Sequence, residues 1–384
     1  MKHINNSGSL AMRSLPSKQA GLSLIELMVA SVIGLFILAG AVTVFSGNSA
    51  SSKLSNGMAK IQDSGRVTLD ILSNSIRMAG FEGCKSDSKD SPVVLASTAP
   101  VINFPNTALW GAEISTVGWA PAKPADLNNI ANAEPGTDVI YLQHGSGRTT
   151  NLAANMTGST DTSIALVNNP DQLNIGDMVM ISDCQDSNIF RTSDVSNDTP
   201  ANGNTTLTYG ASVNSQGNLT ETFQGTGDLA STPLRVMRFI STAYYVAESG
   251  RTTGAGDPIL SLFSVDTTSI DTSTNQIGTS VELVEGVENI QILYGELIPS
   301  SRDIRYVTAN NVGQMNNVVS VQIGVLIATP DYVTNSNDDR TYSIAGTTIG
   351  PPGDTTADAN HLGDRRMRAA FNTTIQLRNR NNLL

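Results

Sequence analysis

The most informative segment of the chain reads Gln19-Ala20-Gly21-Leu22-Ser23-Leu24-Ile25-Glu26-Leu27-Met28-Val29-Ala30 and opens an apolar run that ends at Phe45. From Leu22 to Phe45 the only charged residue is Glu26. About 20 apolar residues are enough to cross a bilayer as a helix. The segment before this run contains basic residues and no acidic ones, which favours a cytoplasmic N-terminus. We therefore expect the rest of the chain to lie on the other side of the membrane.

Two other readings of this run are a secretory signal peptide and a plain membrane anchor. A signal peptide would be cut after the run, where Ala39-Gly40-Ala41 and Ser46-Gly47 offer small residues. Neither reading explains Glu26, because an acidic side chain costs about 2.5–3.5 kcal/mol at the centre of a membrane helix and less near its end. Ionisable groups in such segments point to a function.

The helix is predicted to continue well beyond Phe45. Apolar or small residues recur in steps of three and four, which trace one helix face, at Leu54, Met58, Ile61, Gly65, Leu69, Leu72 and Ile76. No proline occurs between Leu22 and Ser91, and Gly80 is suited to end the helix. We expect Gly47 and Gly57 to be weak points, since glycine disfavours a helix interior.

After Phe81 the pattern changes to short strands, so the predicted fold class is α+β, a long helix packed on a β-rich head. We expect polar surface loops or hairpins around 146–162 and 193–232, and a loop over 335–364. The predicted strands are Val139–Leu142, Met178–Ser182, Thr205–Tyr209, Leu234–Phe239, Thr242–Val246, Ile259–Val265, Ile290–Tyr294, Val318–Ala328 and Phe371–Leu377.

The charge of the chain bears on one class of function, the binding of DNA. The net charge of the chain is −11, and residues 1–21 carry three basic and no acidic side chains, so the remainder is at −14. Such a body disfavours sequence-independent DNA binding, which needs a positive surface. The closing arginines form one candidate basic patch, although a solvated face or strand ends explain them more simply. They are Arg365, Arg366, Arg368, Arg378 and Arg380.

The sequence shows no pattern typical of an enzyme or of a metal or cofactor site. The three histidines are His3, His144 and His361, and the last two are isolated in sequence that is predicted to form loops. No histidine pair at helical spacing, Cys–His cluster or phosphate-binding loop is present. The acidic loops lack the spacing of an EF-hand and are expected to be solvated. We expect no cofactor and no catalysis.

The segment around Gly21 resembles the processing signal of type IV prepilins and pseudopilins: a glycine, an apolar residue, and a glutamate at the fifth position of the mature chain. The resemblance implies that a prepilin peptidase cuts between Gly21 and Leu22, and that the new amine of Leu22 is methylated. It also implies that Glu26 pairs with the amine of a neighbouring subunit. An acid that serves only its own helix N-terminus is the other reading, and the two are compatible.

Four further blocks resemble the PilW family of minor pilins. They are residues 76–84, 181–190, 283–291 and 365–380. The first two contain Cys84 and Cys184. An even cysteine count in an exported chain favours one disulfide, and two unrelated buried thiols are the alternative. Joined, these cysteines would tie the end of the helix to the β-rich head.

The resemblance divides the chain into a leader (1–21), a transmembrane and polymerisation segment (22–45), an amphipathic helix segment (46–80) and a periplasmic head (81–384). It implies a minor pilin that joins other minor pilins and the major pilin to prime pilus assembly. The protein would move from the inner membrane to the tip of the extracellular type IV pilus, where a PilY-type adhesin is a further expected partner. A J-type minor pseudopilin of a type II secretion system and a competence pilin remain alternatives.

Overall fold

The computed structural model describes residues 21, 23–83, 92–97, 104, 108–128, 130, 132–183, 186–197, 204–225, 234–268, 270–271 and 276–379. The chain divides into two compact units, Met1–Lys53 and Leu54–Leu384. One long helix, α1 (Leu24–Met78), begins in the first unit and ends in the second. The described part of the first unit consists almost entirely of this helix. The predicted helix over 22–79 is thus confirmed, with observed bounds of Leu24–Met78.

In the second unit, helix α1 buries one face against the head. The residues on this face are spaced by three or four positions, as one side of an α-helix requires. Leu54 and Met58, which were predicted to belong to this face, are instead 46% and 45% exposed. The buried residues are Gly57, Ile61, Gly65, Thr68, Leu72 and Ile76.

Gly57 and Gly65 let the head approach the helix closely. A Cβ on Gly65 would lie only 2.6 Å from the ring of Phe371, and one on Gly57 would lie 3.2 Å from methyl groups of Thr329 and Val333. The helix is continuous through Gly57. The prediction that Gly57 weakens the helix is therefore wrong, because this glycine is retained at a contact where a larger side chain would not fit.

The end of helix α1 is fixed by a glycine and by a residue from the far end of the chain. Gly80 has a φ of +77°, the left-handed conformation that commonly ends helices. The Asn379 side-chain amide lies 3.2–3.3 Å from the carbonyl oxygens of Arg77, Met78 and Ala79. The last carbonyls of a helix have no partner inside it. The Met78 carbonyl also accepts the Phe81 N–H at 2.8 Å, and the Asn379 amide adds side-chain hydrogen bonds at this helix end.

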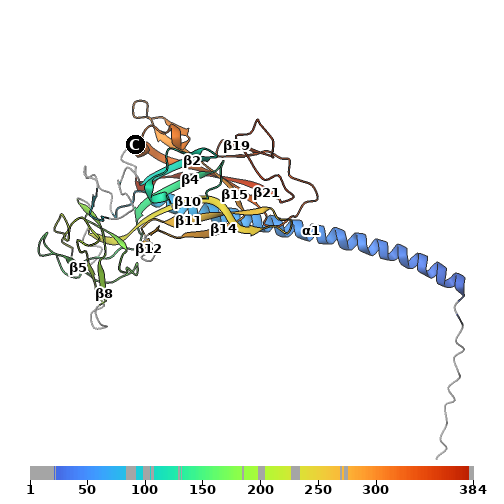
Figure 1. Cartoon of the computed structure of the whole chain (residues 1–384), viewed down its shortest axis with the longest axis horizontal. Helices are drawn as coiled ribbons and strands as arrows, with labels where there is room; N and C mark the ends of the chain where they lie inside the picture. Colours follow the sequence, from blue (N-terminus) through green and yellow to red (C-terminus); the bar gives the residue numbers. More distant parts are fainter. Residues whose placement is uncertain are drawn as a thin grey trace, which may run out of the picture. The chain divides into compact units, whose positions relative to one another are not determined.

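Among the described residues, nine strands form the largest sheet, with the order β1-β7-β6-β10-β4-β2-β3 and with β11 and β14 extending from β10 (Figure 1). The longest strand, β10, pairs with β6 along its first part and with β4 and β11 further on. The strands are β1 (Val93–Val94), β2 (Leu109–Ser115), β3 (Gly118–Ala120), β4 (Asp138–Gly145), β6 (Met178–Ser182), β7 (Ser187–Arg191), β10 (Arg235–Thr252), β11 (Pro258–Asp266) and β14 (Ser280–Glu285).

A second, four-stranded antiparallel sheet has the order β16-β15-β17-β21. Its strands are β15 (Val287–Leu297), β16 (Ile304–Val307), β17 (Val318–Ala328) and β21 (Arg368–Gln376). Buried side chains of helix α1, of this sheet and of the nine-stranded sheet form one apolar cluster, which includes Leu72, Ile140, Leu262, Ile323 and Ile375. Helix and strands thus share a single core, and the α+β class is confirmed.

A second apolar cluster lies around β6 and β7 and includes Phe190, Leu207 and Phe223. It is roofed by three short strands, β5 (Ser163–Leu166), β9 (Thr205–Thr208) and β8 (Asp194–Asn197). The described part of the polar region over 193–232 therefore contains strands and core residues. Its prediction as loops or hairpins is correct only in part. Aromatic and leucine residues spaced among Ser, Asn and Gly supply this burial.

Two other predictions of secondary structure need correction. Leu234–Phe239 and Thr242–Val246 are parts of the single strand β10, since Ile240 and Ser241 pair with His144 and Gln143 of β4 and do not form a turn. The loop predicted over 335–364 contains β18 (Tyr342–Ile344), β19 (Thr347–Gly350) and β20 (Ala359–Asn360). A pair of very short strands, β12 (Ile270–Asp271) and β13 (Gln276–Ile277), completes the described sheets.

Candidate functional site

The N-terminal segment combines a helix cap with an uncovered apolar surface. Ser23 Oγ accepts a hydrogen bond from the Glu26 backbone N–H at 3.2 Å, and Glu26 Oε2 accepts one from the Ser23 N–H at 3.4 Å. This reciprocal pair is a capping box, in which a serine and a glutamate three residues later satisfy each other's free amides. The structure thus places Glu26 at its own helix N-terminus. Among the described residues no cation pairs with it.

The apolar side chains that follow have no covering in the chain. Within helix α1 an 18-residue window has a mean hydropathy of 2.5 and none of it is buried. Leu24, Phe36 and Phe45 are each at least 75% exposed. A helix of this length and composition can cross a membrane. Gly21 is described and exposed, whereas Leu22, Cys84 and Cys184 lie outside the described residues, so the cleavage, methylation and disulfide predictions are not tested.

A buried ion network lies in the second unit, where β15, β21 and the loop before β18 meet. Arg368 pairs in a forked arrangement with Glu288, and its Nη2 lies 2.9 Å from Glu288 Oε1 and 2.8 Å from Asp364 Oδ1. Arg366 Nε lies 2.7 Å from Asp364 Oδ2. Asp338 contacts Arg368 at 3.4 Å. All five side chains are at most 9% exposed.

This network contradicts one part of the simplest reading of the closing arginines, the solvated face, although Arg368 does lie at a strand end as the first residue of β21. Arg366 and Arg368 are 1% and 3% exposed, so they lie neither on a solvated face nor in a basic surface patch. A buried guanidinium is tolerated only when carboxylates compensate it, because removing a charge from water is costly. Arg365, by contrast, lies over the ring of Tyr332 at 4.6 Å, and Arg378 is exposed. Arg380 lies outside the described residues.

The charges of the network hold one another in the ionised state. Burial alone would lower the pKa of the Arg368 guanidinium, but its hydrogen bonds to Glu288 and Asp364 outweigh burial and raise the pKa. Burial likewise opposes ionisation of Asp364, yet the hydrogen bond from Arg366 and the charge of Arg368 keep the pKa of that carboxyl below its usual range. The charged forms of Arg368 and Asp364 are thus favoured, and their contacts fix the strand ends that carry them.

A glycine brings the two halves of the network together. Gly286, between β14 and β15, has a φ of +86°, and a Cβ there would lie 2.4 Å from the Ala328 carbonyl oxygen. The Ala328 N–H donates to the Gly286 carbonyl oxygen at 2.8 Å. This close approach sets the start of β15 beside the end of β17, whose Ala328 pairs with Arg368. Glu288 is thereby placed against arginines 78 and 80 residues away in sequence.

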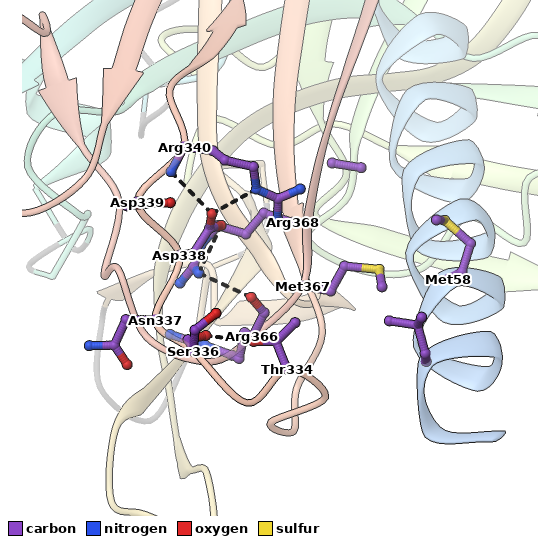
Figure 2. Close-up of a pocket in the computed structure, with 12 residues that line it drawn as sticks. Met58, Thr334, Ser336, Asn337, Asp338, Asp339, Arg340, Arg366, Met367 and Arg368 are labelled. Atoms are coloured by element: carbon purple, nitrogen blue, oxygen red, sulfur yellow. Dashed lines mark hydrogen bonds and ion pairs between the residues drawn. The ribbon is translucent and has the colours of Figure 1, made fainter. Parts of the chain in front are cut away.

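A pocket of about 430 Å³ borders this network (Figure 2). Figure 2 shows Met58 of helix α1 facing the loop residues, with Met367 between them. The wall opposite the helix is polar and is formed by residues around Asp338, Arg340 and Arg368. The part of the chain that the structure describes contains no group of three or more His, Cys, Asp or Glu side chains suited to a metal ion.

The sequence reasoning named Glu288 and Arg366–Arg368 within family-like blocks but assigned them no partner, and it did not single out Asp338 or Asp364. The signal available in the sequence was that Glu288 has no basic residue near it, so any cationic partner had to come from a distant segment. One of the two histidines predicted to lie in loops is placed differently, since His144 is a buried residue of β4. His361 lies in a loop as predicted, but it is buried there, with its Nε2 2.9 Å from the Arg340 carbonyl oxygen and its Nδ1 accepting the Gly363 N–H at 3.0 Å.

Comparison with known families matches these two regions. Residues 16–42 match the prokaryotic N-terminal methylation motif, and residues 243–379 match the model of the type IV pilus-assembly protein W. The second match includes β15, β17, β21, the whole buried ion network and Asn379. A search of curated proteins gives no match.

The methylation motif, the uncovered apolar helix and the β-rich head that follows it define a prepilin-type protein of a type IV pilus system. Within that class, residues 243–379 are similar to the type IV pilus-assembly protein W. That family is a structural component of the pilus, and the match implies contact with other pilus components.

Proposed function

We propose that the protein is a minor pilin that joins other minor pilins to prime type IV pilus assembly and remains at the pilus tip. A prepilin peptidase would cleave it between Gly21 and Leu22, and Leu22 would be methylated. The observation that carries the proposal is the methylation motif at the start of an apolar helix whose side chains the chain itself leaves exposed. Such a surface needs lipid or the helices of other subunits to cover it.

The proposed contact between subunits runs through Glu26. In an apolar bundle a carboxylate needs a cationic partner, because an unpaired buried charge is strongly unfavourable. Ser23 supplies hydrogen bonds to Glu26 but no positive charge. The amine of a neighbouring subunit would supply that charge. The head, which extends from residue 81 to residue 384, is bulky, and a bulky head is easier to accommodate at a tip than in a packed shaft.

The first test is the mass and N-terminal sequence of the protein extracted from membranes. We expect a chain that begins at N-methylated Leu22. A chain that begins after residue 40 would identify an ordinary secreted protein, and an intact leader would identify a plain membrane anchor. Either result would contradict the proposal.

The second test separates subunit pairing from helix capping at Glu26. In a strain lacking the native gene we expect Glu26→Ala and Glu26→Gln to be processed normally but to impair piliation. Glutamine keeps the capping box and removes the charge. Ser23→Ala is the matched control, because it removes the cap at a cost of about 1 kcal/mol and keeps the carboxylate. Normal piliation with Glu26→Gln would rule out pairing, and loss of piliation with Ser23→Ala alone would show that capping is what matters.

The same strain distinguishes the alternatives. Loss of the protein should abolish or reduce pili; intact pili with failed secretion of folded proteins would identify a minor pseudopilin instead. DNA binding by the purified chain with a steep dependence on salt would favour the competence pilin. A PilY-type adhesin should be lost from the cell surface together with the minor pilins if the tip placement is correct.

A further inference from the structure

A second cleft lies away from the ion network, where β2, β15 and the short strands β18–β20 meet. Its volume is about 750 Å³, and residues from several elements line it. Three of its lining side chains are acidic and none is lysine or arginine. The acidic residues are Glu113, Asp138 and Asp358. The cleft therefore offers negative charge without an internal cation to neutralise it.

Glu113 and Asp138 face each other across two strands. They are direct partners in the antiparallel pairing of β2 with β4, so their side chains leave the same face of the sheet. Asp138 is 5% exposed, and its Oδ2 accepts the Ile292 N–H at 2.7 Å. Within the described residues no hydrogen bond reaches its other oxygen, Oδ1, although the residue lines the cleft. An almost fully buried carboxyl thus presents a free acceptor to the cleft.

Two more polar atoms nearby lack partners among the described residues. Oε1 of Glu113 is buried without a hydrogen bond, and so is the hydroxyl of Tyr294. The Tyr294 hydroxyl lies beside Gly111, two residues before Glu113 on the same face of β2, since a Cβ on Gly111 would lie only 1.7 Å from it. Buried polar groups are almost always satisfied in folded proteins, so the two atoms mark unmet hydrogen-bonding capacity behind the cleft wall that carries Glu113 and Asp138.

The electrostatics agree with this placement. Burial raises the pKa of the Asp138 carboxyl well above its usual range, against the lowering effect of the Ile292 hydrogen bond, and the Glu113 carboxylate raises it further. Burial, with smaller contributions from Asp138 and Glu113, also raises the pKa of the Tyr294 hydroxyl. Both shifts favour the neutral forms, and a cation placed beside Asp138 would offset the cost of ionising that carboxyl.

We propose that this cleft receives an arginine side chain of a partner protein, held by Glu113 and Asp138. A guanidinium carries five N–H donors in a planar fork and matches two carboxyl groups better than a single ammonium does. The cleft is far larger than a bare metal ion needs, and the described residues provide no cluster of three metal-ligating side chains. A second copy of the chain is a poor occupant, because two bodies with a net charge of −11 repel each other. That the partner belongs to the pilus rests on the proposed function; the binding itself does not.

The test uses the full chain, purified in detergent micelles, with N-acetyl-arginine amide labelled with ¹³C in the guanidinium as the probe. N-acetyl-citrulline amide, neutral and nearly isosteric, is the control. We expect NMR line broadening with the arginine probe only, and dissociation constants at least tenfold higher for Asp138→Asn and for Glu113→Gln. Asparagine can still accept the Ile292 amide, so Asp138→Asn should fold; urea unfolding checks this. Asp303→Asn, an exposed acid outside the cleft, should bind as the unmodified chain does.

Equal broadening with citrulline, or unchanged binding in both cleft variants, would overturn the proposal. So would binding of calcium chloride that depends on Asp138 in the absence of arginine binding, since the cleft would then be a metal site. Binding that appears only after Arg380→Gln would assign the cleft to the chain's own C-terminus. Binding that a rise in protein concentration replaces with a dimer would assign it to a second copy. Because every arm is measured on the purified chain, a failure here differs from a failure of piliation or processing.

Discussion

Arg368 has the most demanding environment of any single residue described here. Its guanidinium is buried and reaches Glu288, Asp364 and Asp338, which come from three separate segments. Buried ion pairs seldom add much net stability, because desolvation offsets their attraction. Their effect is to make alternative arrangements costly, since any shift would leave a charge unpaired. The network therefore specifies how the C-terminal strand joins the sheet.

Replacing Arg368 should be far more damaging than its charge alone suggests. Arg368→Met would leave the surrounding carboxylates without their main cation, and we expect a loss of about 3–5 kcal/mol in the free energy of unfolding. Urea unfolding of the full chain, followed by fluorescence of Trp110 and Trp119, measures it. Arg378→Met, at an exposed position, should change stability by less than about 0.5 kcal/mol. A loss below about 1 kcal/mol for Arg368→Met would show that the network is not maintained in solution.

Glu82, just after the helix, makes stability depend on pH. Burial raises the pKa of this carboxyl from 4.5 to about 7. The folded state thus binds the proton more tightly than the unfolded state, and this contribution is complete below pH 4.5 and is lost as pH rises through about 7. We expect stability to fall between pH 5 and 8, and to fall less in Glu82→Gln. Urea midpoints at four pH values test this; parallel curves for the two proteins would contradict it.

Among the secondary-structure elements, helix α1 has two different environments along its length. Up to Phe45 its side chains are exposed and apolar, and from Gly57 onward one face is buried in the head. The close approach at Gly57 attaches the helix to the segment that follows β17, and the close approach at Gly65 and the cap from Asn379 attach it to β21 and to the segment after that strand. The head is therefore built onto the helix by its last residues, and folding of this region requires contacts between the two ends of the chain.

Gly65→Ala tests the close approach of helix and sheet. Alanine favours a helix interior over glycine by up to about 1 kcal/mol. The new Cβ would nevertheless lie 2.6 Å from the Phe371 ring, so we expect a net loss of about 1–3 kcal/mol from overpacking. Gly47→Ala, with nothing within 4 Å, should cause no loss. Combining Gly65→Ala with Phe371→Leu should recover part of the stability. A stabilised Gly65→Ala single variant would contradict the packing seen here.

At the scale of the whole molecule, several contacts between distant segments lie in the region that matches the PilW family model. Residues 243–379 supply the four-stranded sheet, the ion network and the Asn379 cap. The second apolar core around Phe190 lies outside that match. The part of the head that matches the family model and the part that forms this second core are thus different segments of the chain.

The predicted Cys84–Cys184 bond would also join distant parts of the molecule, by tying the end of the helix to the β-rich head. It closes a loop of about 100 residues, for which the chain-entropy model gives about 4.7 kcal/mol. We expect no free thiol in the mature protein under denaturing, non-reducing conditions, and a lower urea midpoint after reduction. Cys84→Ser should lower the midpoint as reduction does. Two titratable thiols per chain would exclude the bond.

Local sequence was sufficient wherever the physical cause is local. The apolar run to Phe45, the periodic face containing Ile61, Leu72 and Ile76, and the stop at Gly80 follow from composition, spacing and backbone preference. Strands such as β6 and β17 were predicted with their observed bounds because β-branched and apolar residues fill them between turn residues. The α+β class and the prepilin-type N-terminus rest on these features.

The tertiary structure decided everything that depends on which distant segments meet. No local pattern indicates that Glu288 lies against Arg368, that Glu113 lies opposite Asp138, or that Gly57 is a contact and not a weak point in the helix. Burial of the arginines could not be foreseen, because a charged side chain alone in sequence is expected to be solvated. Strand pairing and register bring compensating charges together, and they arise from the packing of the whole chain and not from the spacing within any segment.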